Sequence, residues 1–167
     1  MISLKNIVLE NQYNIQPTDR IIMARKDILP LKFPVVQNNW YAGKPNGLWY
    51  AIGTEWLDWI ESEMPHWKGN VLYKIEINPQ SMCMIKTKEQ FLNFNKKYSE
   101  SRKYGVSVSD KHKDINWGRV AEDYSGIEIA PYRSEFRHKY LWYYGWDVAS
   151  GCIWKRDGVK NINKIKG

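Results

Sequence analysis

The sequence predicts a single domain of the α+β class that spans residues 1–167. A chain of this length can bury one hydrophobic core without the help of disulfides or a metal ion. Short apolar or alternating runs, which are typical of strands, are interspersed with three amphipathic stretches, which are typical of helices. Since both kinds of element have one apolar side, we expect them to pack in layers around a shared core.

Five stretches have the pattern of strands. They are short, rich in apolar residues and bounded by glycine, proline, asparagine or charged residues. The candidate strands are Arg20–Arg25, Leu48–Ile52, Val71–Ile77, Ile127–Ala130 and a final stretch within Trp146–Trp154. Successive side chains of a strand point to opposite faces, so each of these runs presents one face to the core.

Three stretches have the pattern of helices. Apolar side chains recur at helical spacing in residues 54–64, 87–98 and 115–124. Thr87 and Gln90 stand at the spacing of a capping box, in which each side chain bonds to the backbone of the other residue.

The segment between residues 43 and 55 has the features of one wall of a ligand cleft. Residues 43–47 contain two glycines and a proline, which predicts a turn that leads into the aromatic strand Leu48–Ile52. Gly53 ends that strand, and Thr54 can cap the helix that follows. Glu55 then lies in the first turn, where the helix dipole favours a negative charge.

The run Gly47-Leu48-Trp49-Tyr50-Ala51 resembles the Gly-Ile-Tyr-Phe-Ala strand of the ADP-ribosyltransferase superfamily, most plainly that of the poly(ADP-ribose) polymerase branch. In that family the strand carries the aromatic residue that stacks on the nicotinamide of NAD, and a helix and a core strand follow it. The stretches 54–64 and 71–77 have the same order here. The resemblance implies two small mixed or antiparallel sheets that form a cleft, with helices at the periphery.

The resemblance also implies how this strand binds NAD as a substrate. Gly47 opens the motif, and Trp49 takes the position of the stacking residue, with Tyr50 as the alternative. Lys44 stands in the preceding turn, where its ammonium can hold a phosphate as a point charge.

The first strand departs from the family pattern. In the family it supplies a histidine or arginine that binds the adenine ribose or the diphosphate. Met23 stands at the histidine position here, which leaves Arg25, or secondarily Arg20, to contact the diphosphate. The alternative is that both arginines are solvated ends of the strand.

The family's catalytic glutamate has no counterpart in this chain. In the family it opens a strand that reads roughly Glu-Tyr-Ile-Val-Tyr-Asp, and aligning Ile153-Trp154 with Val-Tyr puts Ser150 at its position. That carboxylate polarises the nicotinamide ribose and stabilises the cation that develops there. Asp147 is the nearest carboxylate that could replace it, with Ser150 assisting, and Glu128 on the preceding strand is a second candidate.

Charge and aromatic content point to the partners. The formal charge is +7, and the chain contains nine Trp and eleven Tyr, which fill cores but also stack on nicotinamide or unpaired bases. Residues 95–114 are expected to form an exposed loop and are the richest basic segment, with Lys96, Lys97, Arg102, Lys103, Lys111 and Lys113. If the protein contacts a phosphate backbone, we expect the contact in this segment, and the alternative is that it is plain solvated surface.

Two functions from different classes follow. The first is an ADP-ribosyltransferase-like protein that transfers ADP-ribose from NAD to DNA, RNA or protein. The second is a non-enzymatic, basic and aromatic-rich module that binds nucleic acid or protein. Abundant Lys, Asn and Ile suggest an AT-rich genome, so a phage or toxin-like effector fits either function, with an antitoxin or a host protein as partner.

The sequence also sets expectations for the compartment. No apolar run approaches the roughly 20 residues of a membrane helix, and residues 1–10 lack the features of a signal peptide, so we expect a cytoplasmic protein without a membrane partner. Cys83 and Cys152 are expected to be reduced, buried thiols. The three histidines are expected at the surface, and no spacing of histidine and cysteine indicates a metal site.

Overall fold

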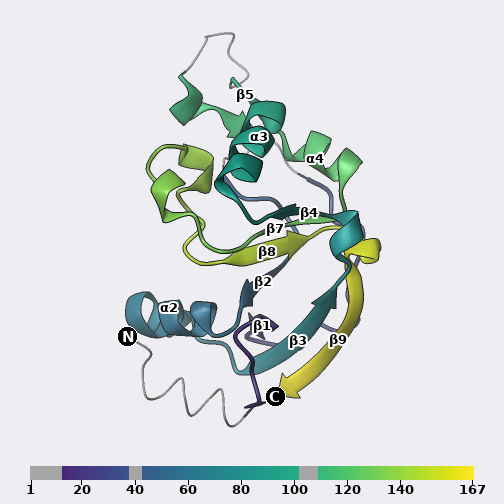
Figure 1. The fold of residues 1–167 in the computed structure, drawn as a ribbon. Coiled ribbons are helices and arrows are strands. Elements are labelled where there is room, and N and C mark those ends of the chain that lie inside the picture. Colours follow the sequence, from purple (N-terminus) through teal and green to yellow (C-terminus); the bar gives the residue numbers. More distant parts are fainter. Residues whose placement is uncertain (1–12, 38–42, 102–108) are drawn as a thin grey trace.

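A curled mixed sheet forms the centre of the structure, a computed structural model that describes residues 13–37, 43–101 and 109–167 (Figure 1). The strands are β1 (Arg20–Ala24), β2 (Leu48–Ile52), β3 (Val71–Ile77), β4 (Met82–Ile85), β5 (Ser99–Glu100), β6 (Asp114–Ile115), β7 (Gly126–Ile129), β8 (Ser150–Ile153) and β9 (Val159–Lys166). Seven of them form one sheet in the order β4-β7-β8-β2-β1-β3-β9. The β4–β7 pair is parallel and the other pairs are antiparallel. β5 and β6 form a separate two-stranded ladder.

Three α-helices lie around this sheet in the described part of the chain: α2 (Glu55–Glu63), α3 (Lys88–Tyr98) and α4 (Trp117–Asp123). The capping box of α3 is confirmed, because Thr87 Oγ1 accepts a hydrogen bond from the Gln90 amide at 3.2 Å and Gln90 Oε1 accepts one from the Thr87 amide at 3.1 Å. Thr54 stands at the N-cap of α2 but makes no side-chain cap bond; its hydroxyl donates to Asp58 Oδ2 at 3.2 Å.

The α+β class is confirmed, but the expected pair of small sheets is replaced by one continuous sheet. The reason is that β1 pairs on both sides: Arg20 lies opposite Ile52 of β2 and opposite Ile75 of β3. The strands on either side of β1 are therefore joined by backbone hydrogen bonds. The curl of the sheet, visible in Figure 1, replaces the expected separation into two layers.

Two strands of this sheet were absent from the sequence prediction. β4 is four residues long and has no alternation of polar and apolar residues that would identify it. β9 was not among the expected strands, but six of its eight residues pair with β3 at the edge of the sheet. Lysine and asparagine are suited to such an edge, because charge discourages pairing with another chain.

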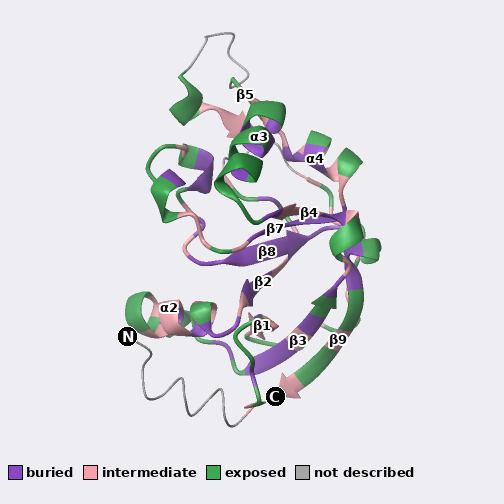
Figure 2. Cartoon of the chain, viewed as in Figure 1, coloured by how far each residue is buried: buried purple, intermediate pink, exposed green. Residues whose placement is uncertain are grey.

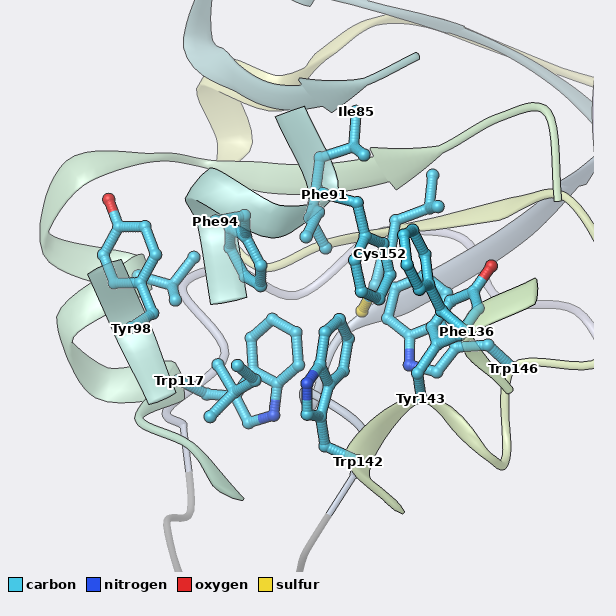
Figure 3. Packing of buried hydrophobic residues seen from close by; sticks show 14 of the residues in the cluster. Ile85, Phe91, Phe94, Tyr98, Trp117, Phe136, Trp142, Tyr143, Trp146 and Cys152 are labelled. Atoms are coloured by element: carbon cyan, nitrogen blue, oxygen red, sulfur yellow. The ribbon is translucent and has the colours of Figure 1, made fainter. Parts of the chain in front are cut away.

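Most of the buried aromatic residues lie on one face of the sheet, beneath α3 and α4 (Figure 3). Strand alternation explains the arrangement: Ile127 and Ile129 of β7 and Cys152 of β8 face this cluster, whereas Ile153 faces a second cluster on the opposite side. Four tryptophans in the first cluster are at most 2% exposed: Trp117, Trp142, Trp146 and Trp154. Core packing therefore accounts for a large part of the aromatic excess.

The described part of residues 95–114 is not the single exposed loop that the sequence predicted. Its first residues belong to α3, and β5, a short 3₁₀ turn and β6 follow. Lys97 pairs with Asp123 at 3.0 Å, and Lys113 pairs with Asp110 at 2.7 Å. Arg102 and Lys103 lie outside the described residues.

The surface that Figure 2 shows in green includes much of α3 and β9, while β7 and β8 are buried. Cys152 is buried as expected, whereas Cys83 is only half-buried. Within residues 13–37, 43–101 and 109–167, no helix is both long enough and apolar enough to cross a bilayer.

Candidate functional site

A pocket of about 200 Å³ lies where β1, β2 and the start of α2 meet the chain that enters β8. We call it the Trp49 pocket. Ile21 and Met23 of β1, Trp56 of α2 and Trp146 and Val148 before β8 supply apolar walls. Trp49 and residues 146–148 and 150 line the same space.

Trp49 forms a fixed aromatic wall of this pocket. Its indole Nε1 donates to the Pro45 carbonyl oxygen at 3.3 Å, which ties the ring to the preceding turn. Its ring packs edge-on against Trp146 with the centroids 4.9 Å apart and the planes at 68°. Trp146 is 1% exposed and belongs to the aromatic core, so the position of Trp49 is set from behind by a rigid neighbour.

Two cations and one carboxylate lie at the polar side of the pocket. Lys44 Nζ is 5.2 Å from the centroid of the Trp49 ring, within the range of a cation–π contact. Partial burial lowers the pKa of Lys44 below its usual value, and the negative charge of Asp147 opposes that shift. Arg137 Nη2 donates to Asp147 Oδ1 at 2.9 Å, and the Asp147 side chain is only 15% exposed.

The Ser150 end of the pocket is held by hydrogen bonds. Ser150 is buried, and its Oγ donates to the Val148 carbonyl oxygen at 3.0 Å, so it braces the bend before β8. Glu55, in the first turn of α2, accepts a hydrogen bond from the Ala149 amide through Oε2 at 2.8 Å. Desolvation raises the pKa of the Glu55 carboxyl above its usual value, against the effect of that amide. These bonds fasten α2 to the chain that carries Asp147 and Ser150.

Glu128, expected as a catalytic candidate, lies in a buried network rather than in the pocket lining. Arg20 Nε and Nη2 donate to its two carboxylate oxygens at 2.6 and 3.0 Å. The Tyr50 hydroxyl also donates to Glu128 Oε2, at 2.7 Å. Burial, followed by the charge of Glu128, raises the pKa of Tyr50 well above its usual value, so this hydroxyl remains a donor.

The same network explains Gly151. Tyr50 and Glu128 are both cross-strand partners of Gly151, so the three residues form one row across β2, β8 and β7. A β-carbon at Gly151 would overlap the end of the Tyr50 ring. Because Gly151 has no side chain, the Tyr50 ring can cross it and its hydroxyl can reach Glu128. Although Tyr50 contributes to the pocket lining, its polar group serves this network instead of a ligand.

Two other expected site residues also lie outside the pocket lining. A β-carbon at Gly47 would overlap the Ile153 carbonyl oxygen, so Gly47 is required for close packing of the turn on β8. Arg25 lies beyond the end of β1, where its Nη2 donates to the His66 carbonyl oxygen at 3.1 Å. Of the eight expected site residues, the pocket thus brings together Lys44, Trp49, Tyr50, Asp147 and Ser150.

Sequence reasoning gave no role to Trp56, Trp146 or Arg137. Trp146 directly precedes Asp147, which was an available signal for a shared wall. Arg137 pairs with Asp147, ten positions along the chain, and no local pattern marks such a contact. Among the described residues, no group of three or more acidic, histidine or cysteine side chains is arranged to hold a metal ion.

No family model, curated protein or solved structure significantly matches the chain.

Proposed function

We propose that the protein binds NAD in the Trp49 pocket, with the nicotinamide ring against Trp49, and transfers ADP-ribose to a macromolecule. The observation that carries the proposal is the position of Trp49 beside residues 146–148 and 150. These are the two segments that the resemblance to ADP-ribosyltransferases aligns with the nicotinamide-stacking strand and the catalytic strand.

The size of the pocket supports a single ring as its occupant. Sites for drug-sized ligands measure on the order of 300–1,000 Å³, so a pocket of about 200 Å³ holds a part of a dinucleotide and not the whole. Trp49, Trp56 and Trp146 supply flat, rigid faces, which suit an aromatic ring. The remainder of NAD would extend out of the pocket.

The charges at the pocket support an anionic ligand. Lys44 and Arg137 carry one positive charge each and Asp147 one negative charge, which leaves this corner with a formal charge of +1. Lys44 is not fixed by an ion pair in the described part of the chain. Its ammonium is therefore the group best placed to meet a phosphate of a bound dinucleotide.

In the proposed reaction, the bond between the ribose anomeric carbon and the nicotinamide nitrogen breaks. Nicotinamide leaves with the bonding electron pair, and positive charge develops on the ribose. A nucleophilic oxygen or nitrogen of the acceptor then bonds to the anomeric carbon and loses its proton. Asp147 is the carboxylate in the pocket, and its negative charge would stabilise the developing cation.

A second candidate is binding of NAD or another nucleotide without transfer. It is favoured by the engagement of both expected carboxylates: Asp147 is held by Arg137, and Glu128 is held by Arg20 and Tyr50. A carboxylate that is already paired offers a developing cation less stabilisation than a free one. This alternative keeps the pocket and its ligand but removes the chemistry.

The test combines titration calorimetry with separate assays of nicotinamide release and of ADP-ribose transfer. NAD labelled in its adenine ring is incubated with the protein and with DNA, RNA or protein acceptors, and the label on each acceptor is measured. We expect NAD to bind, and Trp49→Leu and Lys44→Ala to weaken binding while Lys160→Ala, an exposed control on β9, does not. Binding without release would establish the second candidate. Absence of NAD binding to the parent protein would overturn both.

A further inference from the structure

A second pocket, of about 300 Å³, opens between the end of β1, α2 and the 3₁₀ turn Pro65–Trp67. We call it the Trp67 pocket. It shares Met23 and Trp56 with the Trp49 pocket but has its own walls, which Ile60 and Trp67 supply. Arg25 lies in its lining.

The floor of this pocket depends on Gly69. A β-carbon at Gly69 would overlap the backbone of Ala24, so only glycine lets the chain before β3 lie against the end of β1. The Gly69 amide donates to Met23 Sδ at 2.9 Å, which closes the floor. The depression is therefore part of the packing of β1 and β3.

Three tryptophans form a continuous aromatic surface beside the pocket. The rings of Trp56 and Trp59, one helical turn apart on α2, are stacked with centroids 5.1 Å apart and planes at 12°. Trp67 follows, with its centroid 6.2 Å from that of Trp59. Trp67 is 45% exposed, whereas the core tryptophans are at most 2% exposed. A large flat ring in water beside a pocket is a stacking surface for a planar ligand.

Arg25 adds a cation with unused donors. In the described part of the chain its side chain makes one hydrogen bond, from Nη2 to the His66 carbonyl oxygen. A guanidinium has five N–H donors, so the others can meet a phosphate. The nearby acidic residue Glu61 is paired with Lys68 at 3.1 Å, which reduces its opposition to an anion.

We propose that the Trp67 pocket binds an unpaired nucleotide of single-stranded nucleic acid, with the base stacked on Trp67 and the phosphate on Arg25. Aromatic surfaces combined with arginine are how proteins hold single strands without reading sequence. The net charge of +7 favours a polyanionic strand over a free mononucleotide. This site does not depend on NAD, so it stands or falls separately from the Trp49 pocket.

The test is fluorescence anisotropy with fluorescein-labelled oligo(dT) and oligo(rU) of twelve nucleotides, in the absence of NAD. Because stacking of one base is worth roughly 1–3 kcal/mol, we expect Trp67→Ala to weaken binding about 5- to 150-fold. Arg25→Ala should weaken binding and lower the slope of log affinity against log salt by about 0.7, the value for one phosphate of a single strand.

Matched controls remove similar groups from elsewhere on the surface. Leu92→Ala removes a 38%-exposed apolar side chain from α3, and Lys160→Ala removes a charge from the start of β9; neither should lower the affinity appreciably. Trp67→Leu is measured as well, to separate loss of stacking from loss of apolar area.

Four results would overturn the proposal. One is equal affinity for the parent protein, Trp67→Ala and Arg25→Ala. Another is equal binding of a duplex and a single strand, since a duplex offers no unpaired base. The third is competition by a free mononucleotide at the same concentration as the strand, which would assign the pocket to a small ligand. Protein captured by this surface with no oligonucleotide binding would likewise count against it.

Discussion

Tyr50→Phe separates the buried network from the ligand pocket. The substitution removes the hydroxyl that donates to Glu128 Oε2 at 2.7 Å, and it keeps the ring that lies against Gly151. Glu128 retains both hydrogen bonds from Arg20. Because the Tyr50 hydroxyl serves Glu128, we expect the protein to lose stability and to keep its affinity for NAD.

The magnitude follows from the kind of bond that is lost. A hydrogen bond to a charged group contributes about 1.5–3 kcal/mol to stability. For a domain of 150–250 residues, 1 kcal/mol corresponds to a shift of roughly 2–4 °C in Tm, so Tyr50→Phe should lower Tm by about 3–12 °C. Glu128→Gln should cost more, because it leaves the Arg20 guanidinium without its ion pair.

Thermal unfolding followed by circular dichroism measures the first effect, and calorimetric titration with NAD measures the second. Tyr144→Phe is the matched control, because Tyr144 is 50% exposed, and its Tm should match that of the parent. An unchanged Tm in Tyr50→Phe would refute the structural role of the network. An unchanged Tm together with weakened NAD binding would instead return Tyr50 to the ligand site.

Three other outcomes are expected. Lys44→Ala should weaken NAD binding about tenfold at pH 7. The NAD affinity of the parent protein should fall as the pH rises toward the lowered pKa of Lys44, and Lys44→Arg should remove this fall. A parent affinity that does not depend on pH would contradict the role of Lys44. Asp147→Asn should slow nicotinamide release about 10²- to 10³-fold, and an unchanged rate would exclude it as the stabilising carboxylate. Hydrogen bonds from Tyr98, then Lys97, lower the pKa of Asp123. The stability that Asp123 contributes is therefore present above the unfolded pKa of about 3.9 and is lost as the pH falls through the folded pKa. Between pH 5 and pH 3, the Tm of Asp123→Asn should change less than the Tm of the parent.

Local patterns predicted the elements that have strong local signals. The capping box at Thr87 and Gln90 and the alternation of Val71–Ile77 both correspond to elements of the structure, because each depends on neighbours within a few residues. β4 was missed because its pairing partners in β7 lie 44 positions away in the sequence. β9 was missed because it is defined by its pairing with β3, which is also distant in the sequence. Such partners leave no local signature in a single sequence.

Some features of the candidate site were also expected from the sequence, and others were not. The resemblance to ADP-ribosyltransferases led us to expect Trp49 beside the chain that enters β8, and Trp49 and residues 146–148 and 150 line one pocket. The roles of Tyr50 and Glu128 could not be predicted from the sequence. The Tyr50 hydroxyl reaches Glu128 only because Gly151, which lies between them on β8, has no side chain. The pairing of Asp147 with Arg137 was also invisible, because it joins two irregular segments.

The most direct measurement of the central claim is a crystal structure of the protein with NAD bound. We predict that the nicotinamide ring lies against Trp49 at the usual carbon–carbon contact distance of about 3.5–4.0 Å, next to residues 146–150, with a phosphate oxygen within reach of Lys44 Nζ. NAD bound elsewhere, with the Trp49 pocket empty or filled only by solvent, would contradict the account.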